Sequence, residues 1–334
     1  DSARALVAAA GAQLAGTEVV LANPRLAGLG GPGGGAAALA ADLGADLLVT
    51  DLAGPPSDGP LGTGKRQPVR APRLAKGSRL VLLTSGTTAP PKAIRLARSG
   101  RQGLAALALA GATGLRGGEP TLVWPPLCHG YGLAIATLCL ITGSPMILPG
   151  ALAGVGGTVG GGGGRGAAKG AVALAAIRRY GVRVVAAVPA QLGFLAAHLG
   201  SGSAPSGMGE RIRTVVTGGD PLDAAVARAV QDRWGRVLVN FYGATESGTL
   251  TFAARWDFAR DPTCAGRPAA GVRIEILDPR GRSVPPGETG RVRASSSLVS
   301  APDTPGARLA TLADLGYLDA AGNLHILGRA LAPD

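Results

Sequence analysis

A short run of hydroxyl side chains, closed by a lysine, is the first part of this sequence that could do chemistry. Behind the apolar segment Leu80–Leu83 stand a glycine and four hydroxyl residues, namely Thr84, Ser85, Gly86, Thr87 and Thr88. Lys92 follows seven positions after Ser85. Backbone N–H groups and hydroxyls of such a turn can surround phosphate oxygens, while an ammonium group answers their charge. The pattern predicts a polyphosphate cradle, although it is not a Walker loop and an ordinary Ser/Thr turn would look the same.

Further motifs follow this turn in a fixed order. They are the segment 125–133 around His129, the loop Gly218, Gly219, Asp220 and Pro221, the segment Asn240, Phe241, Tyr242, Gly243, Ala244, Thr245 and Glu246, and the residues Asp314 and Arg329. In wording and order they resemble the motifs of the adenylate-forming superfamily, which includes acyl-CoA synthetases, luciferases and peptide-synthetase adenylation domains. The resemblance runs from Thr84 to Arg329 and is strongest to fatty-acyl-CoA synthetases.

The resemblance implies an ATP site that is assembled from distant segments. It places the phosphates at residues 84–92, and it places adenine at the loop 218–221 and the segment 240–243. Asp314 would accept hydrogen bonds from both ribose hydroxyls, and Arg329 would donate to the ribose.

The resemblance also implies roles in the reaction itself. Adenylation joins a carboxylate to the α-phosphate of ATP, so two anions must meet, and Mg²⁺ and hydrogen-bond donors must absorb their charge. Glu246 would be the Mg²⁺ ligand, Thr245 would hydrogen-bond the α-phosphate, and His129 would border the acyl carboxylate. The implied overall function is ATP-dependent activation of a fatty or other carboxylic acid, followed by transfer to coenzyme A. Transfer to an acyl carrier protein remains open.

Plainer interpretations exist for these residues. Tyr242 could be a core tyrosine, Glu246 a solvated loop carboxylate and His129 a structural histidine. Ala89 and Ala93 stand where the family usually has glycine, which adds Cβ atoms where backbone must approach phosphate. A degenerate nucleotide- or acyl-binding module without adenylation activity is therefore the alternative function. A serine hydrolase is disfavoured because no Gly-x-Ser-x-Gly elbow occurs.

Alternating helix and strand patterns must position the motifs. Helices are predicted at 3–14, 36–43, 103–110, 131–141, 172–180, 191–199 and 223–234. Strands are predicted at 18–21, 46–50, 80–83, 145–148, 183–188, 214–217 and 237–241, and shorter ones at 272–277, 290–294 and 324–327. We expect an α/β fold in which βαβ units form parallel-containing sheets covered by helices. A small antiparallel β subdomain is expected towards the C-terminus.

The expected domain organisation follows from these patterns and from the resemblance. Residues 1–270 would form the nucleotide- and acyl-binding region, with a flexible glycine-rich loop at 154–170, and residues 271–334 would form the β subdomain. The resemblance implies that the chain covers the large N-terminal domain only. The C-terminal lid domain, with its catalytic lysine, is expected to lie outside this sequence.

Composition and the spacing of charged residues argue against two further classes, nucleic-acid-binding proteins and transmembrane proteins. The net charge is +12, but the basic residues are scattered and are not interleaved with aromatic residues, so nucleic-acid binding is not expected. No charged residue occurs between Glu119 and Arg165, yet prolines and a glycine tract interrupt this stretch, so we expect an apolar acyl-binding wall and no transmembrane span. The three cysteines show no metal-binding spacing, which favours a reduced, cytoplasmic protein.

Overall fold

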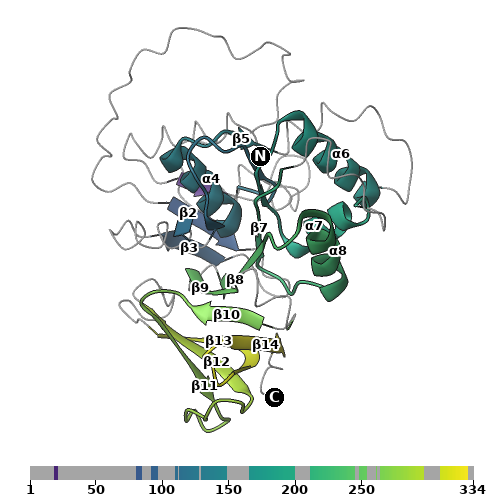
Figure 1. The fold of residues 1–334 in the computed structure, drawn as a ribbon. Coiled ribbons are helices and arrows are strands. Elements are labelled where there is room, and N and C mark those ends of the chain that lie inside the picture. Colours follow the sequence, from purple (N-terminus) through teal and green to yellow (C-terminus); the bar gives the residue numbers. More distant parts are fainter. Residues whose placement is uncertain are drawn as a thin grey trace. The chain divides into compact units, whose positions relative to one another are not determined.

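The computed structural model describes residues 19–21, 80–84, 92–96, 110–111, 113–127, 129–148, 165–199, 211–244, 248–253, 261, 264–296 and 309–329. The chain divides into two units, and Figure 1 labels many of their helices and strands. The first comprises residues 1–98 and 126–129, and the second comprises residues 99–125 and 130–334. The predicted helices at 3–14 and 36–43, the strand at 46–50 and most of the helix at 103–110 lie outside the described residues.

The first unit contains a three-stranded sheet in the order β1 (Val19–Leu21), β2 (Leu80–Thr84) and β3 (Lys92–Leu96). β1 pairs with β2 in parallel, and β2 pairs with β3 in antiparallel fashion. The strands β1 and β2 were predicted, whereas β3 was not. Because β2 and β3 are antiparallel neighbours, the predicted phosphate loop is the connection of a hairpin, with Thr84 directly opposite Lys92.

In the second unit, the described strands form one continuous sheet, whose first part is parallel. Five strands stand there in the order β5-β4-β6-β7-β8: Met146–Ile147, Thr121–Val123, Val184–Ala186, Thr214–Gly218 and Leu238–Ala244. Each pairs in parallel with its neighbour. Their short apolar runs are buried on both faces, as expected for parallel strands that helices cover.

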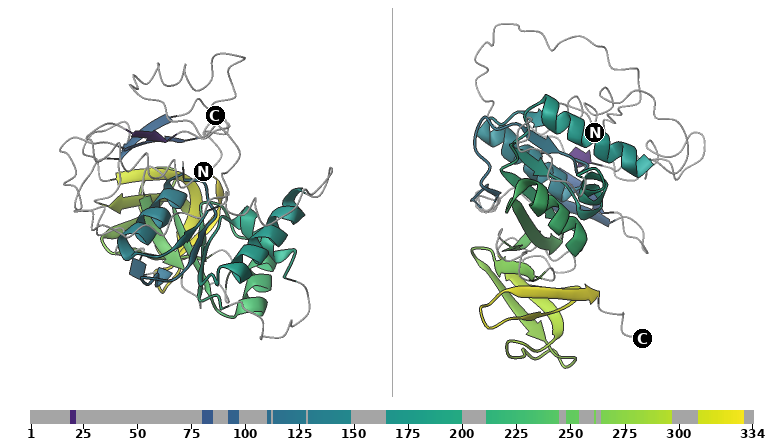
Figure 2. Two further views of the ribbon diagram at one scale, coloured as in Figure 1. Left: turned by 90° about the horizontal axis from the view of Figure 1, so that it is seen from above. Right: turned by 45° about the vertical axis from the view of Figure 1, so that its right-hand side comes forward.

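Three helices cover one face of this parallel part. They are α6 (Arg165–Arg179), α7 (Pro189–Ala196) and α8 (Ala224–Trp234), which pack side by side (Figure 2). The core between helices and strands includes Leu122, Ile177, Val185, Leu192, Val215, Val230 and Leu238. The start of α8 is fixed by Asp223, whose carboxylate accepts hydrogen bonds from the N–H groups of Ala225 and Val226 at 2.7 and 3.2 Å.

The sheet continues into an antiparallel part beyond β8. Its strands are β9 (Gly248–Ala253), β10 (Cys264–Pro268), β11 (Val272–Leu277), β12 (Gly290–Ser296), β13 (Leu309–Leu318) and β14 (Leu324–Arg329), in the order β9-β10-β14-β13-β12-β11. A second core lies here and already includes Leu250 and Ala265, so it starts before Gly271. The expected α/β fold with a parallel-containing sheet and an antiparallel part towards the C-terminus is confirmed.

Several local predictions differ from the structure. The predicted buried helix is α4 (Gly130–Thr142), but Leu140 and Ile141 near its end are 55% and 68% exposed. The strands β4, β9, β10 and β13 were not predicted. The prediction of a loop for residues 165–170 was wrong, because α6 begins at Arg165. Among the described residues, no helix combines the length and the apolar character that a membrane crossing needs.

A close helix contact explains why a glycine is tolerated inside α6. A Cβ atom at Gly170 would overlap the carbonyl oxygen of Phe194 in α7 and would stand 2.7 Å from Nδ1 of His198. Glycine within a helix lowers stability by about 1 kcal/mol relative to alanine. At position 170 the close packing of α6 on α7 offsets this loss. The residue that suggested a loop is a helix contact.

We expect Gly170→Ala to lower the free energy of unfolding by about 1–3 kcal/mol, because the added methyl group must displace the backbone of α7. Gly193→Ala in α7 is the matched control. Its added Cβ would meet only a side-chain atom of Val226, at 3.9 Å, so the gain in helix propensity of about 0.5–1 kcal/mol should prevail. Urea unfolding followed by circular dichroism measures both changes. Equal shifts of the two midpoints would contradict the contact.

Candidate functional site

A carboxylate held between a phenol and a guanidinium group forms the centre of the candidate site. The hydroxyl of Tyr242, in β8, donates a hydrogen bond to Oδ2 of Asp314, in β13, at 2.6 Å. Nε of Arg329, at the end of β14, lies 3.3 Å from Oδ1 of the same carboxylate. Asp314 and Arg329 are also directly opposite each other in the antiparallel pair of β13 and β14. Three residues from three separate motifs therefore meet.

The surroundings of Tyr242 keep its phenol protonated. Burial raises its pKa well above the usual value, and the hydrogen bond to Asp314 and the charge of Asp314 raise it further. Arg329 opposes them weakly. The phenol is therefore a hydrogen-bond donor at neutral pH. A carboxylate has about four acceptor positions, so Asp314 can accept further hydrogen bonds from a ligand, such as those of a vicinal diol.

The loop 218–221 lies beside β8, at the carboxyl end of the parallel strands. Gly218 is the last residue of β7 and pairs with Phe241 of β8. A Cβ atom at Gly218 would overlap the carbonyl oxygen of Phe241 and stand 2.8 Å from its ring. Gly219 follows with φ of +90°, a conformation that favours glycine. Gly219, Asp220 and Pro221 are exposed at the carboxyl end of β7, where open α/β sheets bind ligands.

Two buried polar atoms near this loop have no partner among the described residues. They are Oγ1 of Thr217 and Oδ1 of Asn240. The two residues are direct neighbours in the pairing of β7 with β8, and Thr217 is fully buried. An orphaned buried acceptor costs about 1–3 kcal/mol, so a hydrogen-bond donor of a ligand would stabilise these atoms. Asn240 was predicted to be a binding residue, whereas Thr217 was not, although a hydroxyl in an apolar strand signals it.

An aromatic pair on the opposite face of the sheet supports β8. The hydroxyl of Tyr131, in the first turn of α4, donates to the carbonyl oxygen of Val216 at 2.7 Å. Its ring meets that of Phe241 edge-on, with centroids 4.6 Å apart. Burial raises the pKa of Tyr131. Tyr131 was not predicted to matter. Its role is to fix Phe241, and through it the close approach at Gly218.

His129 belongs to the first unit, in the turn directly before α4. Its N–H donates to the carbonyl oxygen of Pro126 at 3.1 Å. The side chain is half-buried, and this burial lowers its pKa. The imidazole is therefore neutral at pH 7, with one nitrogen able to donate and the other able to accept.

The remaining predicted residues are placed only in part. Ser85, Gly86, Thr87, Thr88, Thr245 and Glu246 lie outside the described residues. The backbones of Thr84 and Lys92 face each other across the hairpin of β2 and β3. In the described part of the chain, no group of three acidic, histidine or cysteine residues could hold a metal ion. The Mg²⁺ site at Glu246 stays a prediction.

Comparison with known proteins identifies a family model and curated relatives that match the chain. The model of the AMP-binding enzyme family matches residues 1–301. A fatty acid–[acyl-carrier-protein] ligase, ScoC of Streptomyces coeruleorubidus, is 30% identical over 74% of this chain and 47% of its own length. A feruloyl-CoA synthase from an Amycolatopsis species is 30% identical over 66% of this chain and 41% of its own length. The chain thus spans less than half the length of these curated relatives.

A solved structure shows the same fold. The o-succinylbenzoate coenzyme A synthetase MenE of Bacillus subtilis, in complex with ATP and magnesium ion, superposes with a TM-score of 0.60. The match covers 75% of this chain and 50% of that one, at 23% sequence identity. At this identity the likeness supports the fold alone.

We expect Tyr242→Phe to lower the free energy of unfolding by about 1–3 kcal/mol at pH 7, because Asp314 loses a donor. The pKa of Tyr242 is raised in the folded chain. The protonated phenol therefore contributes its full stabilisation of the fold below pH 10, and this contribution declines as the pH rises further. Per pH unit above 10, the unchanged chain should lose about 1.4 kcal/mol relative to the variant. Denaturant unfolding from about pH 8 to about pH 11 measures the difference. A difference that does not change with pH would show that the phenol is not the protonated donor.

Proposed function

The chain belongs to the AMP-binding enzyme family, and on that premise we propose that it forms the nucleotide- and acyl-binding part of an enzyme that activates a carboxylic acid with ATP. In the first step, a carboxylate oxygen bonds to the α-phosphorus, and the bond from that phosphorus to the bridging oxygen breaks, so that pyrophosphate leaves. In the second step, the thiolate of coenzyme A or of a carrier protein bonds to the acyl carbon, and AMP leaves with the electron pair. A thioester results.

The position of Asp314 between Tyr242 and Arg329 is the observation that supports this proposal best. Ribose presents two neighbouring hydroxyls, which both need acceptors. Asp314 is an acceptor held in place by two donors, and it lies next to an aromatic ring on which a nucleobase can rest. Arg329, whose side chain is 80% exposed, remains accessible to donate to the same sugar.

The orphaned polar atoms complete the proposed nucleotide site. The amino group of adenine is a donor, and Oδ1 of Asn240 is a buried acceptor without a described partner. Asn240 and Tyr242 are two residues apart on one strand, so their side chains share a face of β8. A base that rests on Tyr242 would present its edge to Asn240, with the hydroxyl of Thr217 beside it.

The phosphates and the acyl group are assigned to residues whose geometry is described in part. Thr84 and Lys92 would meet the phosphates at the hairpin mouth, while neutral His129 would border the acyl carboxylate. Bound at Glu246, Mg²⁺ would offset the charge of the phosphates, and Thr245 would donate to the α-phosphate. We propose a fatty acid as the substrate, because the segment between Glu119 and Arg165 carries no charge. Aryl acids are the competing class.

We expect the chain to bind ATP more tightly than 2′-deoxy-ATP, because Asp314 accepts from the 2′-hydroxyl. Asp314→Asn should weaken ATP binding by about tenfold or more and remove the preference, since a hydrogen bond to a charged group is worth about 1.5–3 kcal/mol. Titration calorimetry measures all four combinations. Asp232→Asn, an exposed change in α8, is the matched control and should leave both affinities unchanged.

We expect Asn240→Leu to reduce the preference for ATP over inosine triphosphate, which lacks the amino group, by about tenfold. The same variant should keep its preference for ATP over 2′-deoxy-ATP. Asp314→Asn should instead lose that preference and keep the preference for ATP over inosine triphosphate. This opposite pattern separates base recognition from sugar recognition. If the unchanged chain binds none of the three nucleotides, the proposal fails and the degenerate acyl-binding module becomes the better interpretation.

A further inference from the structure

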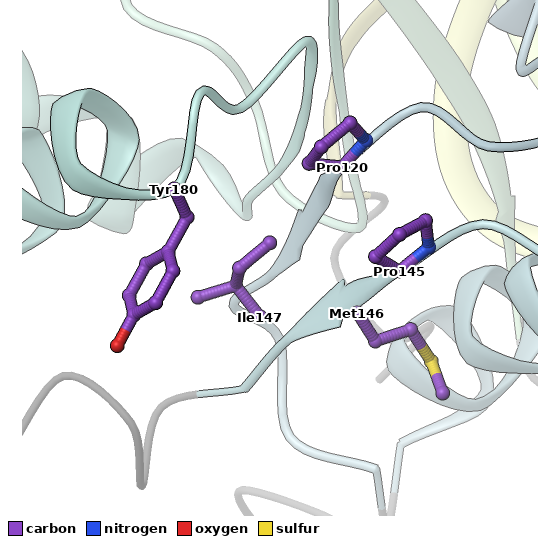
Figure 3. Close-up of a pocket in the computed structure, with 5 residues that line it drawn as sticks. All are labelled: Pro120, Pro145, Met146, Ile147 and Tyr180. Carbon is purple, nitrogen blue, oxygen red and sulfur yellow. The ribbon is translucent and has the colours of Figure 1, made fainter. Parts of the chain in front are cut away.

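A shallow apolar pocket lies at the outer edge of the second unit's sheet. It is lined by Pro120, Pro145, Met146, Ile147 and Tyr180 and has a volume of ≈ 240 Å³. In Figure 3 the Tyr180 ring stands on one side, the two proline rings stand on the other, and Ile147 lies between them. Along the described sheet, β5 is the outermost strand, so the pocket opens at the sheet's border.

The pocket is at the opposite end of the strands from the nucleotide site. Pro120 directly precedes β4, Pro145 directly precedes β5, and Tyr180 directly follows α6. These positions belong to the amino ends of the parallel strands. The loop 218–221 follows the carboxyl end of β7. The pocket therefore has no part in the chemistry proposed above.

Three arginines are tied to residues that line or adjoin this pocket. The guanidinium carbon of Arg179 lies 5.5 Å from the centroid of the Tyr180 ring. The N–H of Arg183 donates to the carbonyl oxygen of Pro120 at 2.8 Å. The carbonyl oxygen of Arg116 accepts from the hydroxyl of Ser144, next to Pro145, at 2.9 Å. The side chains of Arg116 and Arg179 are exposed, and that of Arg183 is half-buried.

Glu119, which directly precedes Pro120, does not neutralise the positive charge of these three arginines, because it pairs with a fourth one. Glu119 receives a hydrogen bond from Nε of Arg213 at 2.9 Å and forms an ion pair with the same guanidinium group. The hydrogen bond from Arg213 lowers the pKa of Glu119, against the opposing effect of burial, and the charge of Arg183 lowers it slightly. Glu119 is thus an ionised carboxylate already held by Arg213. Arg179 adds positive charge at the pocket through its contact with Tyr180, and Arg116 and Arg183 add positive charge on segments whose backbones adjoin it.

The size and chemistry of the pocket favour one kind of occupant. Small-molecule pockets usually measure about 300–1,000 Å³, so ≈ 240 Å³ suits a single large side chain better than a whole ligand. A bilayer is met by protruding apolar groups, whereas this surface is hollow. Arginine, tyrosine and methionine are enriched in protein interfaces, and the planar guanidinium group matches carboxylates. A second copy of the chain, with a net charge of +12, would be repelled.

We propose that the pocket and the three arginines, together called the amino-edge site, bind an acidic segment of a partner protein. One apolar side chain of that segment enters the pocket, and carboxylates on either side of it pair with Arg116, Arg179 and Arg183. Basic residues at the end of α6 alone could be explained by the helix dipole. That explanation does not cover Arg116 and Arg183, which precede strands, or the apolar hollow between them.

The test uses two fluorescent twelve-residue peptides of equal charge, rich in glutamate, with either phenylalanine or serine at the centre. We expect the whole chain to bind the phenylalanine peptide more tightly than the serine peptide, and more weakly as salt is added. The double variant Arg116→Glu and Arg179→Glu should weaken this binding by about tenfold or more. Fluorescence anisotropy measures the affinities, and thermal melting confirms that each variant folds.

Two controls separate a built site from general attraction. Arg228→Glu with Arg291→Glu makes the same change in net charge at exposed positions of α8 and β12, and it should reduce binding much less. Tyr180→Ser should remove the preference for the phenylalanine peptide. The proposal is overturned by equal binding of the two peptides, by an equal effect of the two double variants, or by no peptide binding. Sedimentation with phosphatidylserine vesicles in the absence of peptide binding would assign the edge to a lipid surface instead.

Discussion

The candidate site depends on β8, which pairs in two different ways along its two edges. It is parallel to β7 on one side and antiparallel to β9 on the other. Both edges of its backbone are therefore hydrogen-bonded, and the strand is held in one register. That register directs Asn240 and Tyr242 to one face and Phe241 to the other. The glycine at 218 is a consequence, because Phe241 leaves no space for a Cβ atom there.

The parallel half of the sheet, except for β4, could be predicted from the sequence because its strands are short and apolar and alternate with helices of clear periodicity. The strands at 183–188, 214–217 and 237–241 and the helix at 223–234 were placed within a few residues. The antiparallel half was harder. β10, with the sequence Cys-Ala-Gly-Arg-Pro, contains glycine and proline, and it is a strand because β9 and β14 pair with it. Strand formation of this kind depends on partners rather than on local preference.

In the candidate site too, features that depend on local sequence could be predicted, and features that depend on contacts between distant residues could not. The motifs predicted that Tyr242, Asp314 and Arg329 serve one ligand, and these residues do meet. The hydroxyl in an apolar strand marks Thr217 as unusual, but no pattern in the sequence shows that it lacks a partner among the described residues, or that Tyr131 of α4 supports Phe241. Such facts depend on which polar atoms are left without a partner, and which side chains touch, once the chain is folded. Gly170 is the reverse case, since its local preference pointed to a loop while packing between helices required a helix.

The uninterrupted sheet has a mechanical consequence. Tyr242 and Asp314 stand on strands that are connected through the backbone ladders of β9, β10 and β14, within one unit. Separating these two residues would shear several rows of main-chain hydrogen bonds at once. The hydrogen-bonded arrangement of Tyr242 and Asp314 is therefore set by the sheet before any sugar binds. A ligand that binds these two residues would therefore lose little free energy to ordering them.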